Sequence, residues 1–419
     1  MLKVANGRVY DPKHRVDGEV RDVYYDRGTI VEPTDGPCEV FDASGCAVLP
    51  GGIDIHSHIA GEPLPLLREA GSPVVPTTRR LGEEYAHMGY TLAVNAAMPA
   101  LAARHTFAEE NAIPGLDTAN LVWIGENPVL LELTRRGSDE ELDQYLSWLL
   151  AMSGALGLKL INPCAGSKDG ELPYFRLIGR LTDACARLRL PHPLHLHHPF
   201  LGRMDAFESV AETVERLGGR RIHLAHLQFY GYKKNGDGRT VSAAQELADL
   251  INAHPNVTCD VGAVVFGGAA AVTADTEFAK KLAKGRRGFR SEFWEADGEF
   301  GVLPLRYDPQ NAMGATQFLT GLELLLRMED PSRAFLTTDH PNGGPFTAYP
   351  YLIRLIMDRA FRGEELMRLN PEAVSRSAVP SIMREYTLYE VAQMTRSGPA
   401  AALGLPDRGH LGVGAGGGV

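Results

Sequence analysis

The sequence has no run of about 18 uncharged apolar residues, and its first residues lack the apolar stretch of a secretory signal. We therefore expect a cytoplasmic protein that does not contact a membrane. Basic residues are also in the minority, because 42 lysines and arginines stand against 52 aspartates and glutamates, a formal net charge of -10. A general nucleic-acid binder needs a basic surface, so this balance argues for small molecules and proteins as partners and against nucleic acid.

Cysteine is scarce as well, and the five cysteines never form the close pairs of a zinc knuckle or a redox motif. We interpret them as reduced and mostly structural. They are Cys38, Cys46, Cys164, Cys185 and Cys259. The chain is long, with 419 residues of which 44% are hydrophobic, so it can form one large barrel and a small accessory domain.

Turn residues and apolar runs divide the chain into a small β domain, predicted over residues 1–50, and a larger α/β region. In residues 51–385, eight short apolar runs alternate with helical stretches, which predicts the βα units of a (β/α)8 TIM barrel. The eight runs are residues 52–58, 90–96, 121–125, 156–161, 194–197, 222–227, 257–261 and 334–337. Residues 264–311 do not form one clean helix and predict an insertion over the barrel mouth. Residues 386–419 are expected to return to the small domain.

The clearest chemical signal is the Gly-Gly-Ile-Asp-Ile-His-Ser-His run at residues 51–58. Because side chains alternate along a strand, Asp54, His56 and His58 would share the face turned into the barrel. The two imidazoles could then bind a metal ion, and Asp54 could orient one of the rings. Taken alone, a His-X-His pair among 14 histidines is more often structural.

Lys159 lies between Leu158 and Leu160 in an apolar run, which turns its side chain toward the barrel interior. A lone buried ammonium is costly, and burial favours the neutral amine. The neutral amine can react with CO2 to give a carbamate, an anion able to bridge two metal ions. The alternative is an ordinary buried lysine that is paired with a carboxylate.

Two further histidine pairs lie at the ends of later runs. His195 and His197 share one face, and His197 is nearer the C-terminal end of its strand, where barrel active sites lie. We predict His197 as a metal ligand and His195 as a hydrogen-bonded core residue. His223 and His226 would lie on opposite faces, and His226, the histidine that comes last before the loop, is the predicted ligand.

The eighth run ends at Asp339. A carboxylate there could bind one metal ion and take the proton from the attacking water, although a single aspartate at a strand end is usually a cap or turn residue. Gly343 and Gly344 are expected to shape a loop beside it, since no Gly-Lys-Ser/Thr follows that would indicate a phosphate site. The order His-X-His, Lys, His, His, Asp at successive strand ends is hard to produce by chance.

That order, behind a small β region, resembles the amidohydrolase superfamily over most of the chain. Several stretches are similar to the A subunit of formylmethanofuran dehydrogenase and of the bacterial formyltransferase/hydrolase complex. They are residues 53–61, 95–99, 103–105, 159–163, 226–229 and 336–346. The resemblance implies an amidohydrolase-type barrel with a small N-terminal, and partly C-terminal, β-sandwich domain.

The resemblance also implies a reaction, a cofactor and partners. The reaction would be hydrolysis of the N-formyl group of formylmethanofuran, or of a methanofuran-like carrier, to formate and free amine, or its reverse. Two zinc ions would be held by His56, His58, carboxylated Lys159, His197, His226 and Asp339, with Asp339 as the catalytic carboxylate. The other subunits of such a complex would be the partners.

Two features depart from the family pattern. Family members carry a Cys-Asn-Asn-like stretch after the fifth-strand histidine, whereas residues 198–200 here are His-Pro-Phe, so we expect different substrate contacts. Residues 409–415 resemble the point where family members turn back to complete the small domain. Only the glycine-rich residues 416–419 follow, which predicts an incomplete accessory sheet.

Two other functions stay open. A cyclic-amide hydrolase of the dihydropyrimidinase or dihydroorotase kind uses the same residues, although residues 337–346 argue against it. A scaffold protein without activity is the second, and the complete ligand set argues against it. A basic run could hold an anionic carrier tail, but such runs are usually solvated surface. Its residues are Lys280, Lys281, Lys284, Arg286, Arg287 and Arg290.

Overall fold

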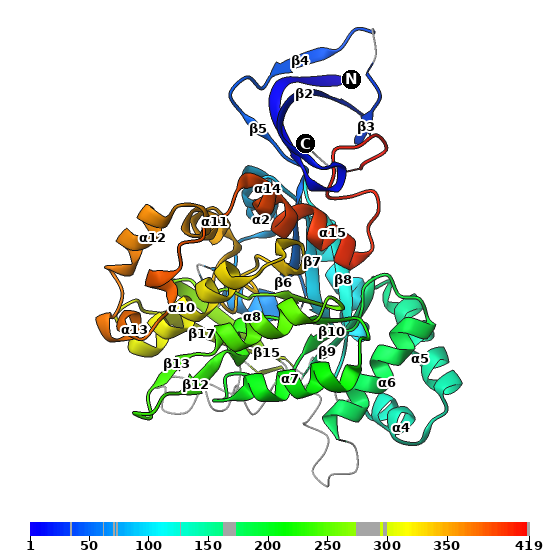
Figure 1. Ribbon diagram of the computed structural model, residues 1–419. Coiled ribbons are helices and arrows are strands. Elements are labelled where there is room, and N and C mark those ends of the chain that lie inside the picture. Colours follow the sequence, from blue (N-terminus) through cyan, green and yellow to red (C-terminus); the bar gives the residue numbers. More distant parts are fainter. Residues whose placement is uncertain are drawn as a thin grey trace.

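The computed structural model describes residues 1–33, 36–61, 63–69, 72, 74–125, 127–161, 173–273, 294–295 and 300–416. Cys164 and the basic run between residues 280 and 290 lie outside the described residues. Figure 1 shows a barrel surrounded by helices, with a small sheet above it. Among the described residues, no helix combines the length and apolar character needed to cross a bilayer.

All eight predicted barrel strands form, and they pair in parallel in the order β18-β14-β11-β10-β9-β8-β7-β6. An isolated parallel bridge between Ser57 and His340 brings the first strand beside the chain that follows the last one, so the barrel is nearly closed. The predicted (β/α)8 fold is therefore confirmed. The strands are β6 (Gly52–Ser57), β7 (Tyr90–Met98), β8 (Asp117–Ile124), β9 (Gly157–Ile161), β10 (His195–His197), β11 (Ile222–Leu224), β14 (Val257–Asp260) and β18 (Ala334–Phe335).

Helices cover the outside of the barrel, and α5 shows why they form where they do (Figure 1). Ser138 and Glu141 make a capping box at its start, and Gly154 ends it in a left-handed conformation (φ 65°). Leu142 and Leu146, four residues apart, are buried against the barrel. The longer helices are α2 (Thr78–His87), α3 (Ala103–Glu110), α4 (Pro128–Arg136), α5 (Asp139–Ser153), α6 (Tyr174–Arg187), α7 (Ala206–Leu217), α8 (Ala244–Ala253), α10 (Ala312–Arg327), α11 (Tyr349–Met357) and α12 (Arg359–Leu366).

The short helix α15 covers the end of the barrel that faces the small sheet (Figure 1). Its Ala402 and Leu403 pack against Ile53, Leu92 and Phe335 of the barrel strands. The other short helices are α1 (Pro63–Glu69), α13 (Pro371–Ser375) and α14 (Leu388–Ala392), and α15 spans Gly398–Leu403. Single helical turns are η1 (Pro12–His14), η2 (Ala100–Ala102), η3 (Leu227–Tyr230), η5 (Pro331–Arg333), η6 (Phe346–Ala348), η7 (Val379–Ser381) and the π-turn η8 (Gln393–Ser397).

The small domain is a mixed five-stranded sheet with the order β3-β2-β1-β4, in which β5 also pairs with β1. Its strands are β1 (Leu2–Asp11), β2 (Val16–Asp26), β3 (Thr29–Val31), β4 (Glu39–Asp42) and β5 (Ala47–Val48). The C-terminal segment reaches this sheet, because Ile30 N donates to Ala415 O and Gly414 N donates to Ile30 O, both at 2.9 Å. The division of the chain at residues 50 and 385 stays a prediction.

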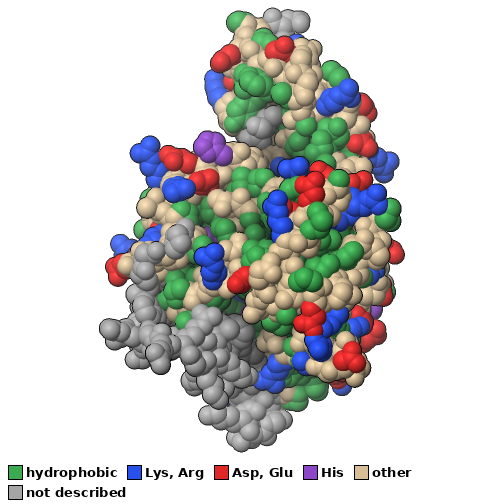
Figure 2. All heavy atoms as spheres, turned by 90° about the vertical axis from the view of Figure 1, so that its left-hand side faces the viewer, with side chains coloured by type: hydrophobic (Ala, Val, Ile, Leu, Met, Phe, Trp, Pro, Cys, Tyr) green, Lys and Arg blue, Asp and Glu red, His purple; other side chains and the backbone are tan. Residues whose placement is uncertain are grey.

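The segment predicted to insert over the barrel mouth contains two antiparallel strands, β15 (Gly267–Thr273) and β17 (Phe300–Tyr307), and this strand pair is called the β15–β17 hairpin below. The two-residue strand β16 (Trp294–Glu295) pairs with β17, and a second small hairpin is formed by β12 (Tyr232–Lys234) and β13 (Thr240–Ser242). In the described part of the face shown in Figure 2, acidic and basic side chains are interspersed, and neither sign forms a large patch.

A buried polar chain holds the loop that follows β6. The side-chain amide of Asn95 on β7 donates to Ala60 O (3.2 Å) and to Asn120 Oδ1 (3.0 Å). Asn120 on β8 donates in turn to Glu110 Oε2 at the end of α3 (2.8 Å). Burial raises the pKa of Glu110 from its ordinary value of 4.5 to about 7.

Glu110 should therefore make the stability of the protein depend on pH. The unfolded chain loses this proton near pH 4.5 and the folded chain only near pH 7, so the unfolded state binds fewer protons between these values. The free energy of unfolding is expected to fall by about 3 kcal/mol as the pH rises through this window, and to level off above it. Glu110→Gln keeps the acceptor for Asn120 and should abolish this contribution.

The free energy of unfolding is measured with a denaturant for wild type and Glu110→Gln at pH 5 and pH 8. The contribution of Glu110 is the change between the two pH values in the wild type minus the same change in the variant. Glu132→Gln, at a half-exposed position on α4, serves as the control and should follow the wild type. Parallel pH curves for wild type and Glu110→Gln would contradict the prediction.

Candidate metal centre

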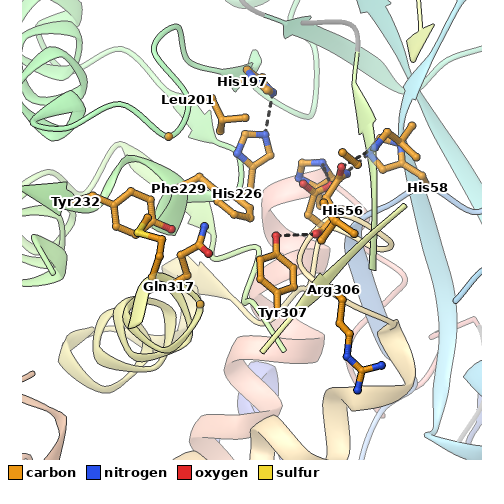
Figure 3. A pocket seen from close by; sticks show the side chains of 18 of the residues that line it. His56, His58, His197, Leu201, His226, Phe229, Tyr232, Arg306, Tyr307 and Gln317 are labelled. Atoms are coloured by element: carbon orange, nitrogen blue, oxygen red, sulfur yellow. Dashed lines mark hydrogen bonds and ion pairs between the residues drawn. The ribbon is translucent and has the colours of Figure 1, made fainter. Parts of the chain in front are cut away.

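One cavity of about 490 Å³ brings the predicted site residues together. It opens at the C-terminal ends of the barrel strands, and Figure 3 shows the histidines gathered on one side of it. All six predicted residues line it, namely His56, His58, Lys159, His197, His226 and Asp339. Their roles as metal ligands stay a prediction. The six side chains do lie around one cavity, as a shared metal centre would require.

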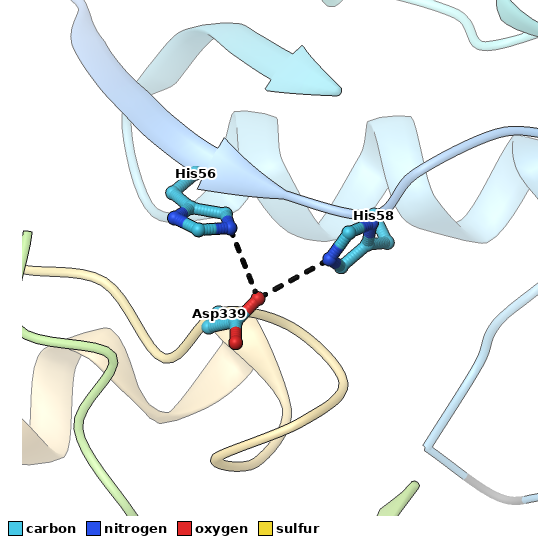
Figure 4. A group of neighbouring side chains, drawn as sticks. All are labelled: His56, His58 and Asp339. Carbon is cyan, nitrogen blue, oxygen red and sulfur yellow. Dashed lines mark ion pairs between the residues drawn. The ribbon is translucent and has the colours of Figure 1, made fainter. Parts of the chain in front are cut away.

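His56, His58 and Asp339 form one close group at the cavity (Figure 4). Oδ1 of Asp339 lies 3.2 Å from Nε2 of His56 and 3.2 Å from Nε2 of His58. One ligand atom from each residue lies within 4.8 Å of the other two, and all three residues are buried. Three such donors around one point have the chemistry and spacing of a metal site.

His197 and His226 form a second group, in which Nδ1 of His197 lies 2.9 Å from Nε2 of His226. Among the described residues, the other nitrogen of each ring has no hydrogen-bond partner. Burial lowers the pKa of His226 to about 3 and that of His197 well below its ordinary value. Both rings are therefore neutral, with the lone pair that a metal ion requires, so this group also fits a metal.

Lys159 lies beside the first group, with Nζ 3.2 Å from Nε2 of His56, and its charge also lowers the pKa of His197 and His226. Leu158 and Leu160 pack into the main core, so Lys159 faces the cavity as predicted. Burial lowers its pKa from 10.5 to about 8. Among the described residues no carboxylate lies within 4.0 Å of Nζ, which argues against the simple buried ion pair.

Two of the presumed ligands adopt unusual backbone conformations. His226 and Asp339 have positive φ angles of 36° and 48°, a region that residues other than glycine seldom occupy. Such conformations persist only where the surrounding structure holds them, and they are concentrated at functional sites.

The prediction that Asp54 orients a histidine ring is wrong. The pairing of β6 with β7 shifts register between Asp54 and Ser57, and this irregularity interrupts the alternation of side chains. Oδ2 of Asp54 instead accepts hydrogen bonds from Tyr85 (2.6 Å) and Tyr349 (2.5 Å) on the surrounding helices α2 and α11. Only its other oxygen supports the site, by accepting from the backbone N–H of His56.

Asp260 orients the His56 ring, and it was not among the residues predicted from the sequence. Its Oδ2 lies 2.9 Å from Nδ1 of His56 and 3.1 Å from Nε2 of His223, while Oδ1 accepts from the backbone N–H of His226 and from Thr337 Oγ1, both at 2.9 Å. Burial alone would raise its pKa, but His56 and His223 outweigh burial and hold the pKa well below its ordinary value. The sequence did contain a signal for Asp260, because it is an acidic residue at the end of an apolar strand. The same feature led to the prediction of Asp339.

The expected opposite orientation of His223 and His226 is also wrong. Strand β11 ends at Leu224, and the chain turns at His226, so the strand alternation does not reach that residue. Both side chains point into the barrel, His226 at the cavity and His223 below it. His195 is fully buried and bonded to His192 (3.1 Å), in agreement with its predicted core role.

The loop after His197 presents an apolar side chain to the cavity. His198 is buried, with Nε2 2.9 Å from Thr213 Oγ1 on α7, and burial lowers its pKa to about 4. Leu201 lines the cavity instead. Residues 198–200 themselves do not line the cavity, and Leu201, which follows them, places a hydrocarbon surface beside the site.

The loop after Asp339, which contains Gly343 and Gly344, is closely packed. A Cβ atom on Gly343 would lie 2.6 Å from Thr338 O and 2.7 Å from Ala263 O, so a side chain cannot fit. Asn342 in this loop donates from Nδ2 to Asp339 Oδ1 (3.0 Å). The loop shapes the surroundings of the carboxylate.

The chain matches known proteins over nearly its full length. A model described as the amidohydrolase family matches residues 39–417. The A subunit of the formyltransferase/hydrolase complex Fhc of Methylorubrum extorquens is 39% identical, and the match covers 99% of this chain and 82% of that protein. Protein FwdA of Methanocaldococcus jannaschii is 35% identical, over 98% and 81% of the two chains.

A crystal structure of the formyltransferase/hydrolase complex (FhcABCD) from Methylorubrum extorquens, in complex with methylofuran, contains a similar chain. It superposes with a TM-score of 0.91 at 38% identity, over 99% of this chain and 82% of that one. The predicted resemblance to these A subunits is therefore confirmed. The family match and the full-length relatives together show that the chain belongs to the amidohydrolase family.

Proposed function

We propose that this chain is the metal-dependent hydrolase of a cytoplasmic formyltransferase/hydrolase-type complex, and that it hydrolyses the N-formyl amide of a methanofuran-like carrier to formate and amine, or forms it. The observation that carries the proposal is the gathering of the six site residues around one cavity, in a chain 39% identical to the A subunit of Fhc. Other subunits of such a complex would be its partners.

The proposed cofactor is a pair of zinc ions. His56, His58 and Asp339 would hold one ion, and His197 and His226 the other. Lys159, whose pKa near 8 leaves much of the amine neutral at mildly alkaline pH, would react with CO2 to form a carbamate between them, with release of one proton. Zinc in such a site, when bound, lowers the pKa of water and polarises a carbonyl oxygen.

Asp339 is the proposed proton carrier. Burial alone would raise its pKa, but attraction to His56 and hydrogen bonds from His56 and His58 outweigh it and keep the carboxyl ionised. The carboxylate takes one proton from the water as its oxygen adds to the formyl carbon. It then gives this proton to the amide nitrogen as the C–N bond breaks, and the remaining acidic proton of formic acid passes to the free amine.

The walls of the cavity would bind the part of the carrier next to the amide. Leu201, Phe229 and Val272 line it and offer apolar surface. This surface suits an uncharged flat group and keeps bulk water from the reacting atoms.

A substrate comparison tests the proposal against the cyclic-amide alternative. The full chain, purified with any partner subunits and loaded with zinc, is assayed with N-formylfurfurylamine, dihydroorotate and hydantoin. We expect formate release from the formyl amide with kcat/KM at least about 100-fold above that of either cyclic amide, because an amide carbonyl in the wrong geometry misses the proton carrier.

Turnover of the cyclic amides alone would show a hydrolase of the dihydroorotase kind. If purified protein binds no metal and turns over none of the three compounds, the chain is a scaffold and the proposal is wrong.

A further inference from the structure

The hairpin of β15 and β17 forms one wall of the cavity. Val272, Leu305 and Tyr307 of the hairpin line the cavity, and Figure 3 shows Tyr307 directed toward the group around His56. Val272 and its cross-strand partner Val302 also pack with Leu64 of α1 in an apolar cluster beside the cavity. The hairpin is thus a distinct element placed over the barrel mouth.

Asn342 connects this hairpin to Asp339 through hydrogen bonds of its side chain and its backbone, one of them from its own N–H to Asp339 O (2.6 Å). Its Nδ2 donates to Asp339 Oδ1 (3.0 Å), and its Oδ1 accepts from the backbone N–H of Val272 on β15 (2.8 Å). Its backbone carbonyl accepts from the hydroxyl of Tyr307 on β17 (3.1 Å). Both strands of the hairpin are therefore bonded to the residue that contacts the carboxylate.

The chemistry of the partners fixes the orientation of the Asn342 amide. A backbone N–H can only donate and an ionised carboxylate can only accept, so a flipped amide would lose both bonds. The amide is also planar and rigid, so a shift of Val272 changes the direction from which Nδ2 approaches Asp339. The position of the hairpin is in this way transmitted to the carboxylate.

We propose that Asn342 is a positioning residue that couples the β15–β17 hairpin to the carboxylate of Asp339. The inference rests on the proposed function for the role of Asp339 and adds to it a residue that controls that role. When substrate packs against Leu305 and Tyr307, the contact holds the hairpin in place and, through Asn342, aims Asp339 at the reacting atoms.

Two substitutions at position 342 distinguish positioning of Asp339 from a purely structural role, in which Asn342 only holds two segments together. Asn342→Asp keeps an acceptor for the Val272 N–H but loses the donor to Asp339. Asn342→Ala loses both the acceptor for the Val272 N–H and the donor to Asp339. Positioning of Asp339 predicts that both variants lose kcat, by about 10- to 100-fold, with KM changed less than about threefold, when assayed at saturating zinc.

Hydrogen exchange supplies a readout that does not depend on activity. The Val272 amide should exchange as slowly in Asn342→Asp as in the wild type and faster in Asn342→Ala, because only the alanine variant loses the acceptor. Tyr307→Phe removes a single hydroxyl bond and is expected to lower kcat by about three- to tenfold, also at unchanged KM.

Asn252→Asp is the matched control, because the Asn252 amide also joins two segments, through Glu329 N and Arg327 O, at a position that does not line the cavity. It should keep the wild-type kcat. If Asn342→Asp also kept the wild-type kcat with a slow Val272 amide, Asn342 would be only a structural tie and the proposal would be overturned.

Failure of the proposed function would look different. A wild type that cleaves a cyclic amide and not a formyl amide would disprove the substrate assignment, while the ratios of kcat for the Asn342 variants could still be measured on the cyclic amide. A loss of kcat confined to Asn342→Ala on either substrate would count against the coupling.

Discussion

Replacing Lys159 by alanine is expected to remove most of the bound zinc and to reduce kcat for formyl amide hydrolysis by at least about 1000-fold. Lys159 is the only lysine among the described residues that line the cavity, with Nζ 3.2 Å from Nε2 of His56, so the variant loses the side chain on which a bridging carbamate would form in the proposed site. Loss of the metal ions removes stabilisation worth several kcal/mol, and each 1.4 kcal/mol is a factor of about ten in rate. The zinc content is measured by elemental analysis of the purified protein, and formate release is assayed in parallel.

Lys159→Arg is the matched control for charge and length. Arginine stays protonated and cannot form a carbamate, so this variant should be as inactive as Lys159→Ala. Addition of acetate should restore part of the activity of the alanine variant only, because a small carboxylate fits in the space left by the side chain. Full zinc content and activity in Lys159→Arg would contradict a carbamate.

Replacing Asp339 by asparagine is expected to lower kcat by about 10²- to 10⁴-fold, the usual range for removal of a general acid–base group. Asparagine has nearly the same size and keeps an oxygen toward His56 and His58, but it cannot take a proton from water. Zinc content is therefore expected to fall much less than kcat. Initial rates at saturating substrate and zinc, together with elemental analysis, test both expectations.

Asp183→Asn, on the outer face of α6, controls for the loss of one carboxylate and should keep the wild-type rate. If Asp339→Asn kept kcat within about threefold of the wild type, another group would carry the proton, and Asp339 would be at most a ligand.

The sequence predicted the site well where parallel strands alone determine the geometry. The C-terminal ends of the strands in a barrel meet at one mouth, so residues at those ends must lie close together. His56, Lys159 and His197 were found in this way, and all three line the cavity. Lys159 faces inward because Leu158 and Leu160 need the apolar surroundings of the helices.

Sequence reasoning failed where a strand was irregular or had already ended. The register shift in β6 turned Asp54 to the helices, and the end of β11 at Leu224 let His223 and His226 face the same interior. Both errors come from extending the strand alternation beyond the regular part of the strand. Asp260 was missed although it ends an apolar strand as Asp339 does, and its importance comes from four partners in other segments, which only the fold brings together.

The sequence by itself determined the barrel, its eight strands and the order of chemical groups around its mouth, because periodicity and strand-end position depend only on local spacing. Only the tertiary structure decided which carboxylate supports His56, and that a hairpin far along the chain is bonded through Asn342 to Asp339. These contacts join residues up to 204 positions apart. Local spacing carries no information about such pairs, since they arise only when the packed barrel brings the strand ends and the inserted hairpin together.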